Sequence, residues 1–196
     1  MTPPFTVLSV CMGNICRSPM SERLLVARLR EHVGDGVDEL LLSHSCGLGG
    51  WHAGEGMTEA TAKELRERGG TDEGFRSRQI TRDMLDISDL IITATSEQVE
   101  YIAAHYPQAL PRTFLVRHLG ALLEHVDATA LPPFAATPEA VQERGVAIVA
   151  AADAVRDKAP ESELDDPWGL DSATYRRIGD ELDETLIPFA RLLVAA

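Results

Sequence analysis

The sequence predicts an α/β fold in which a parallel sheet is flanked by helices. Short apolar runs rich in β-branched residues alternate with segments whose apolar residues recur at helical spacing. Strands that alternate with helices in this way are typical of a parallel sheet. The length of 196 residues is enough for one domain with a sizeable core. We therefore expect a single domain over residues 1–196.

The expected elements follow in order along the chain. Apolar runs such as FTVLSV and DLIITA predict buried strands at 5–10, 40–46, 89–94 and 113–116. Helices are expected at about 18–32, 58–68, 96–105, 137–158 and 172–194. Ser18 is a good N-cap for the first helix, with Pro19 at its first position, and Gly34 and Gly36 end it. Pro188 predicts a kink in the last helix.

Composition restricts the partners and the location of the protein. The formal net charge of −13 argues against nucleic acid and anionic membranes, which are held largely by basic surfaces. No apolar run approaches the roughly eighteen residues of a membrane span, and the N-terminus lacks the features of a signal peptide. We therefore expect a cytoplasmic protein. Three cysteines, an odd number without zinc-site spacing, predict neither a disulfide framework nor a structural metal.

The most informative stretch, residues 10–19, reads VCMGNICRSP. Here a strand ends, a tight loop follows and a helix begins. The amides of the loop and of the first helical turn can point into one concavity, where the helix dipole adds positive potential. Gly13 lets the backbone turn at little steric cost, and Asn14 tolerates left-handed backbone angles. The stretch predicts an anion-binding site.

Cys11 and Arg17 stand at the two ends of this loop. A thiolate at Cys11 would be stabilised by the amides and by Arg17, and the thiolate is the nucleophilic form of cysteine. The planar fork of Arg17 can hold two phosphate oxygens at once. A bare C-x5-R occurs by chance in many proteins, whereas the full string between a strand and a helix is far more specific.

The string C-x-G-N-I-C-R-S-P resembles the phosphate loop of the low-molecular-weight protein-tyrosine phosphatases. The resemblance implies a doubly wound sheet of four parallel strands and two-step hydrolysis through a cysteinyl-phosphate, without a cofactor. It makes Cys11 the nucleophile, Arg17 the transition-state clamp and Ser18 a hydroxyl that supports the thiolate. Asn14 would keep the loop in shape, aided by Ser45. The remaining members of the loop would be Met12, Gly13, Ile15 and Cys16.

A proton donor for the leaving oxygen is expected near Asp165-Asp166-Pro167. An aspartate before proline is biased to an extended backbone, which suits a loop that reaches over a site. Taken alone, this segment is equally a turn with solvated charges. It resembles the late Asp-Pro loop of the family, which implies Asp166 rather than Asp165 as the acid and later as the base. Trp168 would then serve as an aromatic wall.

The resemblance extends over most of residues 5–118 and 163–194. Residues 51–54 (WHAG) resemble the family's W-H-x-G, and Trp51 is either a wall of an aromatic-binding cleft or a partly buried anchor. Phe75 stands where many relatives have His, which puts part of the buried network behind the loop in doubt. Residues 119–160 make the segment before the acid loop much longer than in relatives. We expect a helical insertion there, either a cover that shapes substrate access or scaffold, and we favour scaffold.

Cys16 has two interpretations. It is either a small buried packing residue or, as family resemblance favours, a thiol that captures an oxidised Cys11 as a reversible disulfide.

Three functions remain open from the sequence. The first is a phosphoric monoester hydrolase that removes phosphate from phosphotyrosine in proteins and releases inorganic phosphate. Ile15 favours it, because relatives specific for phosphoarginine carry Thr at that place. The second is an arsenate reductase that uses a small external thiol, since no cysteine follows Cys46 to form a relay. The third is a catalytically weak phosphoprotein-binding module, which is disfavoured because Cys11, Arg17 and Asp166 are all present.

Overall fold

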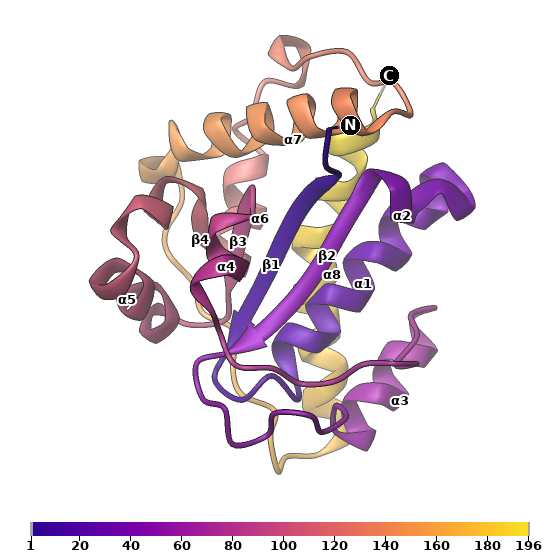
Figure 1. The fold of residues 1–196 in the computed structure, drawn as a ribbon, viewed down its shortest axis with the longest axis vertical. Helices are drawn as coiled ribbons and strands as arrows, with labels where there is room; N and C mark the ends of the chain where they lie inside the picture. Colours follow the sequence, from indigo (N-terminus) through magenta and orange to yellow (C-terminus); the bar gives the residue numbers. More distant parts are fainter. Residues whose placement is uncertain (1, 196) are drawn as a thin grey trace.

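The computed structural model describes residues 2–195 and has the expected α/β fold (Figure 1). A four-stranded sheet has the order β2-β1-β3-β4, with every neighbouring pair parallel. The strands are β1 Phe5–Cys11, β2 Leu41–Gly47, β3 Leu90–Thr93 and β4 Thr113–Leu115. The α-helices are α1 Arg17–Val33, α2 Val37–Leu40, α3 Glu59–Glu67, α4 Arg82–Asp86, α5 Ser96–His105, α6 Val116–Leu123, α7 Pro138–Asp153 and α8 Ser172–Val194. Short 3-10 helices are formed by Gly34–Gly36, Pro107–Arg112, Ala128–Ala130 and Arg156–Lys158.

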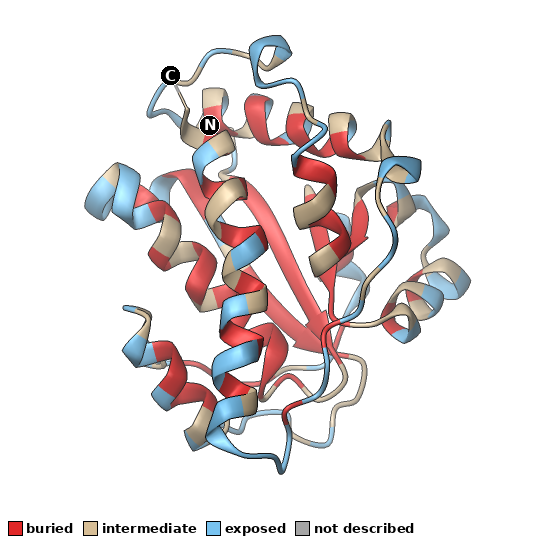
Figure 2. Ribbon diagram, turned by 180° about the vertical axis from the view of Figure 1, so that it is seen from behind, coloured by how far each residue is buried: buried red, intermediate tan, exposed pale blue. Residues whose placement is uncertain are grey.

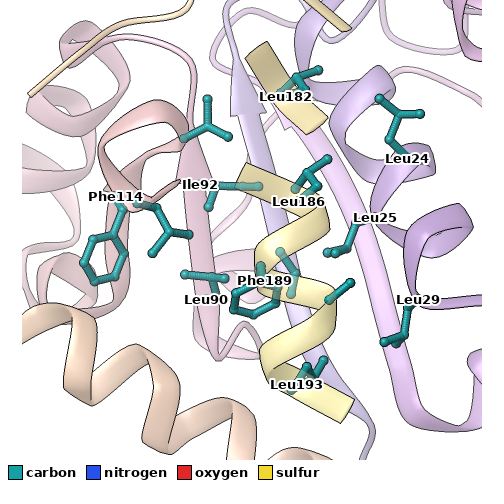
Figure 3. Close-up of a cluster of buried hydrophobic side chains, with 14 of the residues drawn as sticks. Leu24, Leu25, Leu29, Leu90, Ile92, Phe114, Leu182, Leu186, Phe189 and Leu193 are labelled. Atoms are coloured by element: carbon teal, nitrogen blue, oxygen red, sulfur yellow. The ribbon is translucent and has the colours of Figure 1, made fainter. Parts of the chain in front are cut away.

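The two faces of β1 belong to two apolar clusters, as the alternation of side chains along a strand requires. Phe5 and Val7 join the larger cluster, which includes α1 and α8, whereas Leu8 and Val10 join a smaller cluster. In Figure 3, leucines of α1, residues of α8 including Phe189, and side chains of β3 and β4 meet in the larger cluster. Figure 2 shows that α1 and α8 turn buried residues to the sheet and exposed ones outward.

The parallel strands bring all their carboxyl ends to one edge of the sheet, which is where ligands bind in open α/β folds. The last residue of β1 is Cys11, and it lies beside Gly47 of β2 in the register of the pair. In Figure 1 the arrowheads of β1 and β2 both point to this lower edge, where the connecting loops gather.

Helix α7 lies at the opposite end of the sheet, across the start of β1 (Figure 1). A Cβ added at Gly145 of α7 would come within 2.4 Å of the Phe5 ring, so the two elements are in close contact. The helix expected at 137–158 is thus present as α7, and it is remote from the carboxyl edge. The role of residues 119–160 as scaffold stays a prediction.

The expected strands and long helices are all present, with ends that differ by a few residues. The short helices α2 and α4 and the helix α6 were not expected. The interpretation of Ser18 as an N-cap is wrong: α1 begins at Arg17, and its N-cap, Cys16, makes no side-chain capping bond. Pro188 lies inside α8, and a kink there stays a prediction. None of the helices formed by residues 2–195 is both long and apolar enough to cross a bilayer.

Candidate active site

The loop between β1 and α1 turns its carbonyl groups outward. Three of these carbonyls accept hydrogen bonds from backbone amides outside the loop: Cys11 from Leu48 (3.0 Å), Met12 from Gly49 (2.9 Å) and Ile15 from Thr58 (2.9 Å). With its carbonyls held on the outside, the loop can turn amides toward its centre, as the Asn14 N–H does by donating to Cys11 Sγ at 3.3 Å. Inward amides at the start of a helix form an anion-binding concavity.

Asn14 holds the loop through both its backbone and its side chain. Its φ of 56° is the one positive value at a non-glycine position within residues 2–195, and asparagine tolerates this region better than most residues. The side-chain amide is fully buried. Its Nδ2 donates to Ser18 Oγ (2.9 Å) and to Ser45 Oγ (2.8 Å), and its Oδ1 accepts from the backbone N–H of Arg78 (2.8 Å).

The Ser18 hydroxyl lies 2.9 Å from Cys11 Sγ and is oriented by Asn14. Because Asn14 Nδ2 can only donate, it occupies a lone pair of Ser18 Oγ and leaves the hydroxyl proton for another acceptor. Two acceptors are in reach, the Cys11 sulfur and the carbonyl oxygen of Cys46 at 3.2 Å. A thiolate at Cys11 is the stronger acceptor, so Ser18 is placed to stabilise it. This engagement is why Ser18 does not cap α1.

Glu22 extends the buried network, and sequence reasoning missed it. Ser45 Oγ accepts from Asn14 and donates to Glu22 Oε2 at 2.5 Å. Burial raises the pKa of Glu22, with the Ser45 bond opposing that shift. The available signal was its position four residues after Ser18, which puts both side chains on the same side of α1.

The Arg17 guanidinium is almost fully buried and held at two of its nitrogens. Nη1 donates to the carbonyl of Leu164 (3.1 Å), and Nη2 donates to Asp166 Oδ2 (2.9 Å). Its Nε is buried without a hydrogen-bond partner among the described residues. A buried unsatisfied donor is uncommon in folded proteins and calls for an explanation such as a ligand.

One cavity of about 180 Å³ brings together most of the residues that the sequence singled out. Its walls are formed by Cys11, Met12, Gly13, Ile15, Cys16, Arg17, Trp51, His52, Asp166 and Trp168. The other expected residues, Asn14, Ser18 and Ser45, lie behind the loop as its buried support.

Two tryptophans, Trp51 and Trp168, border the cavity with most of their surface free. Trp51 is 66% exposed and Trp168 is 65% exposed. Side chains this exposed are available to an aromatic ligand, and such exposure is not that of an anchor in the core. Trp51 is thus not an anchor in the core, and its role as a wall for an aromatic ligand stays a prediction.

The adjacent carboxylates Asp165 and Asp166 point to different partners. Asp166 pairs with Arg17, accepts from the Trp168 N–H at 3.2 Å and lines the cavity. Asp165 instead pairs with Arg177 of α8 at 2.9 Å. Of the two, Asp166 is the carboxylate that pairs with the guanidinium and lines the same cavity as the thiol.

His52 is a second residue that sequence reasoning did not select, although it stands in the W-H-x-G string. Its Nδ1 lies 2.8 Å from Glu55 Oε2, and its ring meets Trp51 edge-on with centroids 6.3 Å apart. A Cβ at Gly13 would come within 3.2 Å of its ring. His52 thus packs directly on the phosphate loop.

Cys16 and Phe75 are both buried. Cys16 Sγ lies 3.6 Å from the Tyr175 hydroxyl and 3.8 Å from Thr58 Oγ1, and burial raises the pKa of its thiol. Phe75 is buried, with the Arg23 guanidinium over its ring at 5.9 Å. The network of Asn14 and its partners is therefore formed without a histidine at position 75.

These features together can hold a tetrahedral oxyanion against a sulfur nucleophile. The loop and the start of α1 supply amides, Arg17 supplies charge, and Asp166 supplies a carboxyl group at the rim. The exposed indoles can receive an aromatic group attached to the anion.

Comparisons with known proteins agree with this geometry. The model of the family described as low molecular weight phosphotyrosine protein phosphatase matches residues 6–134. Low molecular weight protein-tyrosine-phosphatase YfkJ of Bacillus subtilis is 38% identical over 97 residues, covering 48% of this chain and 58% of that protein. Its counterpart Etp of Escherichia coli is 35% identical over 111 residues, covering 56% and 68%.

The fold is also shared with solved structures. The crystal structure of a YwlE mutant from Bacillus subtilis superposes with a TM-score of 0.65 at 20% identity, covering 95% of this chain and 97% of that one. In sequence, the chain spans only about half the length of the first curated relatives that it matches.

Proposed function

Because the chain belongs to the low molecular weight phosphotyrosine protein phosphatase family, we propose that it hydrolyses phosphotyrosine in proteins and releases inorganic phosphate. The observation that carries this proposal is the position of Cys11 Sγ. It lies at the end of a loop that holds it with the Asn14 amide (3.3 Å) and the Ser18 hydroxyl (2.9 Å), in a cavity shared with Arg17 and Asp166.

In the first step the Cys11 sulfur attacks phosphorus, and the bond from phosphorus to the tyrosine oxygen breaks. Arg17 and the loop amides hold the non-bridging oxygens, on which charge is spread in the transition state. Asp166 gives its proton to the leaving phenolic oxygen. The products are free tyrosine side chain and a cysteinyl-phosphate.

In the second step water attacks the cysteinyl-phosphate, and the sulfur–phosphorus bond breaks. Asp166, now a carboxylate, takes the proton from the water. Inorganic phosphate leaves, and the sulfur returns to a thiolate, which can accept a hydrogen bond from the Ser18 hydroxyl. No metal or cofactor is needed for either step.

Two features support an aromatic substrate. Ile15 presents an apolar side chain in the cavity, and Trp51 and Trp168 flank its opening. Apolar and aromatic walls favour a phenyl ring by burial and by ring–ring contact. The comparisons favour this function over an arsenate reductase or a silent binding module.

The proposal is tested with two aryl phosphates that differ in the acidity of the phenol they release. Wild type should hydrolyse both, and Cys11→Ser should hydrolyse neither. Asp166→Ala should lose about 100-fold or more on phenyl phosphate. It should lose less on p-nitrophenyl phosphate, because that leaving group needs less protonation. Equal activity of Cys11→Ser and wild type would overturn the assignment of Cys11 as nucleophile. Equal losses of Asp166→Ala on the two substrates would overturn the assignment of Asp166 as acid.

We also propose that Cys16 protects the nucleophile. A peroxide would oxidise Cys11 to a sulfenic acid, and the Cys16 thiol would displace water to form a disulfide. Both are free thiols in this structure, and they line the same cavity. Peroxide-treated Cys16→Ser should then fail to recover activity with a reductant, whereas treated Cys46→Ser should recover as wild type does.

A further inference from the structure

A second cavity adjoins the proposed phosphate site and carries the opposite charge. It has a volume of about 330 Å³ and shares Met12, Arg17 and Asp166 with the first cavity. Its other walls come from the start of α5 and from the connection that leads to α8 (Figure 1). We call it the acidic groove, because four carboxylates line it: Glu97, Glu163, Asp165 and Asp166.

The carboxylates of the groove differ in how far they are neutralised. Asp166 and Asp165 pair with Arg17 and Arg177. Glu163 accepts from the N–H and the hydroxyl of Ser96 and forms no ion pair among residues 2–195, although the charge of Arg17 acts on it. Glu97 is exposed and takes part in none of the ion pairs found among residues 2–195. The groove therefore retains negative charge, although the start of α5 and the nearby Arg17 reduce it.

The phosphate clamp Arg17 indicates where the phosphoryl group of a substrate would be anchored. Arg17 Nε is buried without an acceptor, and Arg17 forms the wall between the two cavities. A phosphoryl group that satisfies this nitrogen would hold its substrate directly beside the acidic groove. The groove volume is sufficient for one long side chain. A residue next to the phosphotyrosine can thus enter it.

We propose that the acidic groove binds a lysine or arginine that neighbours the phosphotyrosine in the substrate, an inference that rests on the proposed function. A cationic side chain would approach Glu97 and Glu163, whereas an acidic one would be repelled. The net charge of −13 also favours the approach of basic segments over long distances. The same net charge repels acidic phosphopeptides. Basic peptides would therefore be favoured both during their approach and once they are bound in the groove.

The test uses three phosphotyrosine peptides that differ only at the neighbouring residue, which is lysine, glutamine or glutamate. At low salt, kcat/KM should be about fivefold higher for the lysine peptide than for the glutamine peptide and lowest for glutamate, the scale expected of exposed ion pairs. The preference should appear mainly in KM and shrink as salt is added. A small aryl phosphate, which has no neighbouring residue, should show no comparable salt effect.

Glu97→Lys should abolish or invert the preference while leaving turnover of the small aryl phosphate unchanged. Glu100→Lys is the matched control, because it places the same charge on the same helix at an exposed position outside the groove. Equal kcat/KM for the three peptides with wild type, or equal effects of the two variants, would overturn the proposal.

The binding of the same peptides to Cys11→Ser, followed by tryptophan fluorescence, separates the groove from the chemistry. If wild type does not turn over the peptides but Cys11→Ser binds the lysine peptide with the lowest Kd, the proposed function is refuted and the groove is supported. If wild type turns over the peptides normally but Cys11→Ser binds all three with the same Kd, the groove alone is refuted.

Discussion

Arg17 and Asp166 are joined by an ion pair of 2.9 Å between Nη2 and Oδ2, although they lie 149 positions apart in the chain. Arg17 is buried, whereas the Asp166 side chain is 52% exposed. The proposed clamp therefore lies inside the protein, and the proposed acid stands at the surface. A phosphoryl oxygen held by Arg17 would compete with Asp166 for the same nitrogen.

This competition predicts that removing the carboxylate strengthens phosphate binding while it weakens catalysis. In Asp166→Asn, bound phosphate no longer has to displace the Asp166 carboxylate from Arg17, and it is no longer repelled by the charge of that carboxylate. Because the pair is half-exposed and screened, we expect the inhibition constant for inorganic phosphate to fall only about twofold to fivefold. Competitive inhibition of residual aryl phosphate turnover gives this constant, and calorimetry checks it without turnover.

Asp165→Asn is the control for that measurement. Its carboxylate is paired with Arg177 rather than with Arg17, so phosphate affinity should remain near that of wild type. Tighter phosphate binding in Asp165→Asn than in Asp166→Asn would contradict the assignment of the two carboxylates.

The parts of the fold that were predicted from the sequence are those with local signals. The strand Phe5–Cys11 is an apolar run, and Ser96–His105 is bounded by a capping box and by Pro107. Helix α6 lacks such a signal, because β4 passes directly into it and its N-cap, Leu115, makes no side-chain capping bond. A helix that begins without a capping residue has no start signal in the sequence.

The same distinction applies to the site. Cys11, Asn14 and Arg17 fall within one short string, so their proximity could be read from it. Glu22 and His52 could not be selected in this way, because their importance depends on contacts with Ser45 and Gly13 that only the folded chain creates. The capping rule misplaced Ser18 because it ignores a hydroxyl already bonded to Asn14 and Cys11.

Gly47 is predicted to be essential for the shape of the phosphate loop. A Cβ at this position would lie 2.7 Å from the Met12 carbonyl oxygen and 2.9 Å from the Gly13 carbonyl carbon, both backbone atoms. Backbone cannot yield as a flexible side chain can, so Gly47→Ala should displace the loop. Misplacement of a catalytic group by about 1 Å costs on the order of 100-fold in rate.

Steady-state kinetics of Gly47→Ala on an aryl phosphate measures this loss, with circular dichroism to verify folding. Gly56→Ala serves as the control, because a Cβ there meets nothing within 4 Å. A folded Gly47→Ala with the activity of wild type would show that the loop tolerates the side chain.

Asn14 allows backbone conformation to be separated from hydrogen bonding. Asn14→Ala and Asn14→Gly both remove the bonds to Ser18, Ser45 and the Arg78 amide, so both should lose most activity. At a φ of 56°, alanine carries a further cost of about 1 kcal/mol that glycine avoids. Urea unfolding should therefore find Asn14→Ala less stable than Asn14→Gly, with similar residual turnover. The reverse order of stability would indicate that the loop relaxes to a negative φ.

The burial of His44 leads us to predict that the protein loses stability in mild acid. Its side chain is 7% exposed, and burial, aided by the positive charge of Arg78, lowers its pKa from 6.5 to about 4. Its Nε2 lies 3.0 Å from Ser88 Oγ, whose proton goes to the Met84 carbonyl, so His44 donates as a neutral imidazole. The unfolded chain therefore binds more protons than the folded chain between pH 6.5 and 4, and stability falls as pH falls through that window.

Replacing His44 with glutamine should flatten this pH dependence. The shift corresponds to roughly 3 kcal/mol, lost progressively between pH 6.5 and 4. Urea unfolding of wild type and His44→Gln at several pH values measures the difference, and His32→Gln, at an exposed position, controls for loss of a titrating histidine. His44→Gln is expected to be less stable than wild type near pH 7, because glutamine fits the site less well. Its free energy of unfolding should nevertheless fall less than that of wild type on acidification. If the two proteins lost stability in parallel from pH 7 to 4, His44 would not be the group that binds the proton on unfolding.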